Sequence, residues 1–235
     1  GVTSVRDTGG NLVELVKLRE RLRQRARPTP RVYFSGPLLD GQFPVYDGSD
    51  PARPALGIDV ATRAAAHARV KALKAAGADL IKIYELVQPD VYQALVDAAR
   101  RENLPIASHV PLMLTADQAG PLADSMEHLR NIELACASNW RDLLQQRQAT
   151  FTAFTEGLGY DLRRSLHSGQ RLPAIAAYDE NRCNTVLDTL QNTTQVPTLR
   201  LNTVFQEQPW HREDWPQALA GLPQDVIKPV SYTHL

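Results

Sequence analysis

The sequence has little cysteine and no excess of charge of either sign. Its 235 residues include two cysteines, Cys136 and Cys183, without a Cys-x-x-Cys spacing. This excludes a disulfide-rich scaffold and a cysteine zinc knuckle, and it leaves two free thiols or a single bridge as alternatives. Lys plus Arg and Asp plus Glu both number 26, so the formal charge is zero. The charge therefore gives no reason to expect nucleic acid or an anionic membrane as a partner.

The chain also lacks an apolar run of transmembrane length and an initiator methionine. It begins at Gly1 in what reads as the middle of a strand and has no signal peptide, so we expect a cut N-terminus. Residues 229–235 follow no pattern set by the preceding sequence and look non-native. The compartment stays open, with cytoplasmic and secreted or periplasmic locations both compatible with the sequence.

Short apolar β-runs alternate with helical patterns along the chain, which predicts an α/β fold with parallel strands. The loop at residues 37–58 and a polar helical insertion at about 140–172 interrupt this alternation. We expect a single incomplete barrel domain over residues 1–228, two strands short of a closed (β/α)8 TIM-type barrel. Its six strands are predicted at residues 2–6, 32–35, 80–84, 106–109, 125–128 and 195–201.

Three polar side chains recur at corresponding places in successive units. Lys82 interrupts an apolar β-run, and His109 and His128 each end the next two runs; they are 27 and 19 residues apart. Each gap accommodates one strand, one helix and two loops. In a (β/α) barrel the carboxyl ends of the strands carry the active site. We therefore predict that the three side chains converge at one mouth.

The residue types indicate a metal site. A bare ammonium in a buried strand is costly, whereas a lysine carbamate is an anion that can bridge two cations. Neutral imidazoles suit zinc. Taken singly, Lys82 is better explained as a strand-end lysine whose amine reaches solvent, and each histidine as a structural one. Their recurrence favours the metal site.

The strand alternation places further side chains near the same mouth. Lys82 shares a face with Tyr84, and His128 is expected to share one with Met126. Tyr84 is a candidate for substrate contact, with packing at the rim as the alternative. Arg6 ends the first strand and either binds substrate or pairs with Asp7. His67, His167 and His211 are not expected to be ligands.

The ordered motifs resemble the amidohydrolase superfamily, and specifically its imidazolonepropionase-like and prolidase-like branch. The similarity runs from residue 1 to about residue 205. The resemblance implies that Lys82 is the carboxylated, metal-bridging lysine of the fourth barrel strand. It also implies that His109 and His128 are the metal ligands of the fifth and sixth strands. The matching segments are GVTSVRDTGG (1–10), GADLIKIY (77–84), HVP (109–111), SMEHL (125–129) and VPTL (196–199).

The resemblance implies a function and two missing parts. The expected activity is hydrolysis of C–N bonds in small amides, cyclic amides or dipeptide-like substrates, with two divalent ions, most simply zinc. The family's first strand carries His-x-His and its eighth a catalytic Asp. Neither is matched here, since the surroundings of Asp225 differ from that motif. We therefore expect a chain covering roughly strands two to seven, without its general base and inactive by itself.

Two other functions remain open from the residues alone. Lys82 could act as a Schiff-base nucleophile in an aldolase-like barrel, which needs a depressed lysine pKa and no metal. A barrel that has lost catalysis could instead bind a ligand or a partner. We expect a small-molecule substrate and neither nucleic acid nor membrane, and the sequence leaves a homo-oligomer open.

Overall fold

The computed structural model describes residues 2–26, 28–51, 53–199 and 211–221. The chain divides into two compact units, residues 1–196 and 197–235. Within the described part of the second unit lies one short helix, α10 (Trp215–Ala220). The end of the predicted strand 195–201, Asp225 and residues 229–235 fall outside the described residues. None of the helices in the described ranges combines the length and apolar character needed to cross a bilayer.

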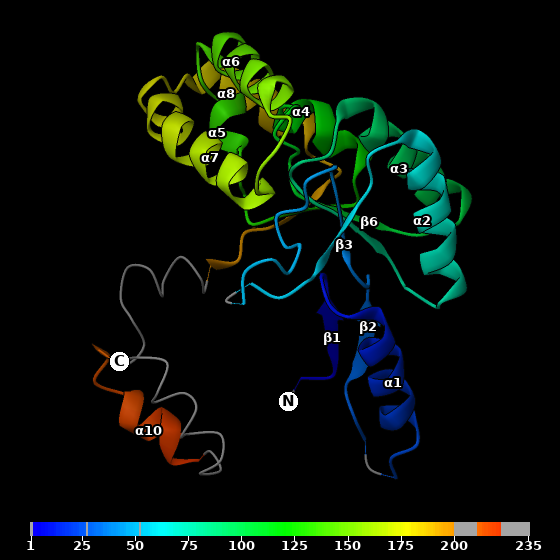
Figure 1. Cartoon of the computed structure of the whole chain (residues 1–235). Helices are drawn as coiled ribbons and strands as arrows, with labels where there is room; N and C mark the ends of the chain where they lie inside the picture. The colour runs from blue at the N-terminus through cyan, green and yellow to red at the C-terminus, as the bar shows by residue number, and fades with distance from the viewer. Residues whose placement is uncertain (1, 27, 52, 200–210, 222–235) are drawn as a thin grey trace. The chain divides into compact units, whose positions relative to one another are not determined.

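The first unit is built on short parallel strands, as the alternation predicted (Figure 1). A two-stranded sheet pairs β1 (Ser4–Asp7) with β2 (Arg31–Phe34). A six-stranded sheet has the order β4-β3-β5-β6-β7-β8. The predicted partial barrel is confirmed as an α/β fold with parallel strands. The strands of the larger sheet are β3 (Leu38–Asp40), β4 (Gly57–Asp59), β5 (Ile81–Ile83), β6 (Ile106–Ser108), β7 (Ser125–Glu127) and β8 (Thr194–Val196).

The prediction of a loop at residues 37–58 is wrong at both ends of that segment. β3 and β4 lie there, and β3 pairs in parallel with both β4 and β5. Between β2 and β3 the chain turns at Gly36, whose φ of 73° lies in the left-handed region that glycine adopts readily. Three-residue strands among Gly, Pro and Asp give too short a pattern for sequence periodicity to detect.

Helices follow the strands, with local signals at their starts. The Asn11 side chain accepts the backbone N–H groups of Val13 and Glu14, and Thr62 and Asp179 cap two other helices in the same way. The helices of this unit are α1 (Leu12–Arg23), α2 (Arg63–Ala75), α3 (Pro89–Arg101), α4 (Ala116–Ala119), the 3-10 turn η1 (Gly120–Leu122), α5 (Ile132–Ala135), α6 (Trp140–Ala153), α7 (Gly159–Ala176) and α8 (Glu180–Thr189).

The two faces of the larger sheet bury different side chains. On the outer face, apolar residues such as Ile83 pack against α2 and α3 in the main core. On the inner face, the strand register places the side chains of four neighbouring strands in one row. Leu38 pairs with Lys82, Lys82 with Ala107, and Ala107 with Ser125. This row points away from α2 and α3, so the polar groups of the strands gather on the inner side.

A layer of helices, α5 to α8, follows β7 and includes the predicted insertion. Cys136 and Cys183 form a disulfide that joins the end of α5 to α8, so the alternative of a bridge is the one the structure adopts. Between α6 and α7, the buried Arg147 guanidinium donates to the side-chain oxygens of Gln170 and Asn131. The layer is thus held by covalent and polar contacts as well as by apolar packing.

Replacing both cysteines with serine should lower the free energy of unfolding by about 2–4 kcal/mol, because the bridge restricts the unfolded chain. The two cysteines are 47 residues apart in sequence, so a long loop is released. Urea denaturation of the oxidised protein and of the double variant measures the difference. A reductant should destabilise the wild type and leave the variant unchanged; equal stability of the two proteins would contradict the prediction.

Candidate active site

Lys82 lies in the middle of β5 and is 1% exposed. Its Nζ atom is buried and has no hydrogen-bond partner among the described residues. Burial lowers the pKa of Lys82 to about 7, with the nearby Glu127 carboxylate opposing this shift and Arg6 adding to it. An orphaned amine in a strand is costly to stability, and such costs concentrate at functional sites. The alternative in which the Lys82 amine reaches solvent is therefore wrong.

His109 follows β6 directly, and its side chain joins the inner face. Its Nδ1 atom lies 2.7 Å from Oε1 of Glu85. Burial, with Lys82 nearby, lowers the pKa of His109 to about 3, so the ring is neutral. An ionised carboxylate only accepts hydrogen bonds, so Nδ1 carries the proton and Nε2 presents a lone pair. This is the arrangement in which histidines bind metals.

His128 reaches the same place by an unexpected route. Strand alternation predicted that it would share a face with Met126, but Met126 packs in the helix-side core. The backbone at His128 instead adopts a left-handed conformation with φ of 68°. This turns the ring toward His109, with the ring centroids 4.9 Å apart and the planes nearly perpendicular. Burial and then Lys82 lower the pKa of His128, which favours a neutral imidazole.

Glu85 organises this edge of the sheet, and sequence reasoning did not identify it. Its side chain is fully buried and accepts hydrogen bonds from His109 and from Arg163, the latter at 3.0 and 3.1 Å. It also contacts Nε2 of His167 at 2.6 Å. Burial would raise the pKa of Glu85, but the hydrogen bonds from His109 and His167 and the Arg163 charge hold it well below its usual range. The carboxylate is therefore ionised.

Two of these partners come from the predicted insertion. Arg163 and His167 are four residues apart in α7, so they project from one face of the helix. The position of Glu85, directly after the strand that carries Lys82, was a usable signal. The i, i+4 spacing of Arg163 and His167 was hidden because that segment was read as irregular.

The two predicted substrate contacts also lie at the inner face. Arg6 donates to Oε1 of Glu127 at 2.9 Å and to Ser125 at 3.2 Å, so it does not pair with Asp7. Tyr84 is 5% exposed, and its ring centroid lies 4.5 Å from that of His109. Burial raises the pKa of Tyr84 far above its usual value, so its hydroxyl keeps its proton. Substrate contact by either residue stays a prediction.

The residues present fit a divalent metal ion. Among the described residues, no group of three or more His, Cys, Asp and Glu side chains could hold a metal. The predicted set differs from such a group because it combines two imidazoles with a lysine. If the orphaned Lys82 amine carried a carbamate, it would form a coherent donor set with the imidazole rings of His109 and His128, and the Glu85 carboxylate would orient the ring of His109.

Comparisons with known proteins bear on the fold. No protein-family model matches the sequence, and no curated protein matches it. A solved Xaa-Pro dipeptidase with bound methionine in its active site is 16% identical with a TM-score of 0.50, over 83% of this chain and 54% of the dipeptidase. A bottromycin amidohydrolase is 20% identical with a TM-score of 0.49, over 95% and 59%. An ochratoxinase from A. niger is 15% identical with a TM-score of 0.45, over 88% and 56%.

The chain shares the fold of the solved Xaa-Pro dipeptidase. The likeness to the dipeptidase confirms the predicted resemblance at the level of the fold. The chain spans about half the length of that structure. Lys82 and His109 lie on the inner face of the sheet, in and directly after neighbouring strands, and the ring of His128 lies against that of His109.

Replacing Lys82 with methionine should raise the free energy of unfolding by about 1–3 kcal/mol at pH 6, because it removes a buried polar atom without a partner. Burial lowers the Lys82 pKa from 10.5 to about 7, so between these values the folded state binds fewer protons than the unfolded state. Wild-type stability relative to the variant should therefore rise with pH in that window.

Urea denaturation between pH 6 and 10 measures this effect. Lys74→Met is the matched control, since Lys74 is exposed on α2 and the same substitution there should change little. A Lys82→Met variant that is less stable than the wild type at pH 6 would show that the amine has a stabilising partner.

Proposed function

We propose that this protein is a metal-dependent hydrolase of C–N bonds in small amides, cyclic amides or dipeptide-like molecules. The observation that carries the proposal is the buried Lys82 amine, which lacks a partner and lies on the same inner face as His109 and His128. The amidohydrolase-type fold supports it. Because the chain spans about half of the dipeptidase, the activity of the whole protein is part of the proposal.

Each side chain of the site has a separate role in this proposal. His109 and His128 would supply imidazole nitrogens, and Lys82, after its amine adds CO2 and releases a proton to form a carbamate, would supply two oxygens. When bound, divalent ions such as zinc would lower the pKa of a water molecule and polarise the substrate carbonyl. Glu85 fixes the ring of His109, and Tyr84 keeps a protonated hydroxyl beside it. Within the described residues, no carboxylate is assigned as general base.

A Schiff-base mechanism is the second candidate, and the lowered pKa of Lys82 favours it. A neutral amine near pH 7 is nucleophilic, and it could attack a carbonyl with loss of water. Borohydride reduction in the presence of a carbonyl substrate separates the two mechanisms, because it would attach the substrate covalently to Lys82. The hydrolase proposal expects no such adduct and expects bound metal.

Zinc titration followed by metal analysis tests the ligand set. His109→Ala and His128→Ala should each lower zinc content, since each removes an imidazole, and Lys82→Ala should lower the number of ions bound. His67→Ala, which changes a histidine on α2, is the matched control and should keep the wild-type content. Full zinc occupancy and undiminished amide hydrolysis in Lys82→Ala would reject the proposal.

Glu85→Gln should weaken zinc binding about 10- to 100-fold, because it removes the carboxylate that orients His109. It should also lower stability by about 3–5 kcal/mol, since the partly buried Arg163 loses its ionic partner, the fully buried Glu85. Competition with a chelator of known affinity measures the first effect and urea denaturation the second. Glu156→Gln, at an exposed position after α6, is the control. Unchanged zinc affinity in a folded Glu85→Gln variant would assign Glu85 a purely structural role.

A further inference from the structure

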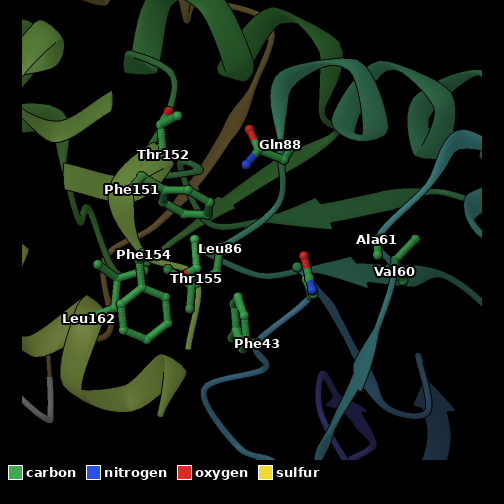
Figure 2. A pocket seen from close by; sticks show the side chains of 12 residues that line it. Phe43, Val60, Ala61, Leu86, Gln88, Phe151, Thr152, Phe154, Thr155 and Leu162 are labelled. Atoms are coloured by element: carbon green, nitrogen blue, oxygen red, sulfur yellow. The ribbon is translucent and has the colours of Figure 1, made fainter. Parts of the chain in front are cut away.

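A cavity of about 470 Å³ opens at the carboxyl ends of the strands and is not explained by the metal site. Its walls come from the segments after β3, β4 and β5 and from the α6–α7 region (Figure 2). The volume lies in the range of pockets that hold small organic ligands.

The cavity is aromatic and uncharged. Phe43, Phe151 and Phe154 contribute three rings to its wall. Phe43 and Phe154 pack edge to face, with centroids 5.1 Å apart. The polar groups are the amides and hydroxyls of Gln and Thr side chains. None of the described residues that line the cavity carries a charge, so a charged group would lose hydration there without compensation.

The walls are tied to the proposed metal site by neighbouring residues. Leu86 lines the cavity and directly follows Glu85, whose carboxylate contacts His109. Leu162 lines it as well and directly precedes Arg163, which donates to Glu85. The ion pair that positions the metal ligand therefore also positions two sides of the cavity.

The remaining walls are equally well fixed. The Asp40 carboxylate accepts the backbone N–H groups of Gly41 and Leu86, which joins the segments after β3 and β5. A Cβ atom at Gly159 would collide with the carbonyl oxygen of Phe43, so the start of α7 packs directly on the backbone of the segment after β3. The cavity is thus a built feature and not a gap between loosely placed loops.

We propose that this cavity is a substrate subsite that takes a neutral apolar or aromatic side chain next to the scissile amide. The proposal rests on the proposed function, and it adds the class of substrate. An aromatic side chain buried there should contribute about tenfold or more in affinity, since full burial of such a group is worth about 1.5–3 kcal/mol.

The test uses the full chain and three probes: N-acetyl-L-phenylalaninamide, N-acetylglycinamide and N-acetyl-L-lysinamide. Calorimetric titration without added metal should show the phenylalanine probe binding about tenfold or more tightly than the other two. Thr152→Trp places a large ring in the cavity and should abolish this preference. Thr150→Trp lies on the same helix outside the lining and should retain it. Thr155→Trp repeats the block from a second position if Thr152→Trp does not fold.

Equal affinities for the three probes, or a phenylalanine preference that survives the cavity-filling variants, would overturn the subsite. Zinc titration of the same protein is a separate readout, because the chain by itself is expected to be inactive. A phenylalanine preference that survives Thr152→Trp, in a protein that binds zinc, contradicts the subsite alone. A phenylalanine preference lost in Thr152→Trp, with no zinc bound by the wild type, supports the cavity assignment and contradicts the metal-dependent hydrolase proposal.

Discussion

This part of the molecule depends on the contacts of the Glu85 carboxylate, which is ionised and completely buried. A buried carboxylate is tolerated only when donors surround it, and here Arg163 and His167 come from α7 while His109 follows β6. The barrel edge and the helical layer are therefore joined through one group. The same contact selects the tautomer of His109, so the lone pair of Nε2 becomes available. A contact that fixes the fold thus also prepares a ligand.

The contacts of the three buried carboxylates near Lys82 explain why its amine has no hydrogen-bond partner among the described residues. Glu127 accepts from Arg6, Asp40 accepts three backbone N–H groups, and Glu85 is fully engaged. Each carboxylate is hydrogen-bonded to other groups, so none accepts a hydrogen bond from the lysine amine, although the charges of Glu127 and Glu85 partly offset its desolvation. The molecule carries the remaining cost in a strand where an apolar residue would pack better. Under the proposed function, the lysine is kept at this position for its chemistry rather than for stability.

Much of this arrangement could be predicted from the sequence, because strand and helix patterns set the order of the units. The convergence of Lys82 and His109 followed from period-two alternation and register. His128 was predicted to join them by sharing a face with Met126, which is wrong: its ring reaches His109 through a left-handed residue at the strand end, which alternation cannot anticipate. Glu85 was missed because its partners lie about 80 residues further along the chain, in a helix that had no recognisable start. Contacts of that kind depend on tertiary packing, which local patterns do not encode.

The helical layer, α5 to α8, contributes aromatic residues to the cavity that could be substituted without changing the contact between Glu85 and His109. Arg163 anchors α7 at Glu85, whereas Phe151 and Phe154 lie at the end of α6 and beyond it, away from that ion pair in sequence. Substitutions among the aromatic residues would change the shape and polarity of the cavity while the contact between Glu85 and His109 stays intact. The strand edge would hold the reactive groups rigidly, while the aromatic residues of the cavity wall could vary independently. A fold built in this way can act on different substrates. Under the proposed function, the layer after β7 and the segments after β3, β4 and β5 would together select the substrate, and the strands would carry the reactive groups.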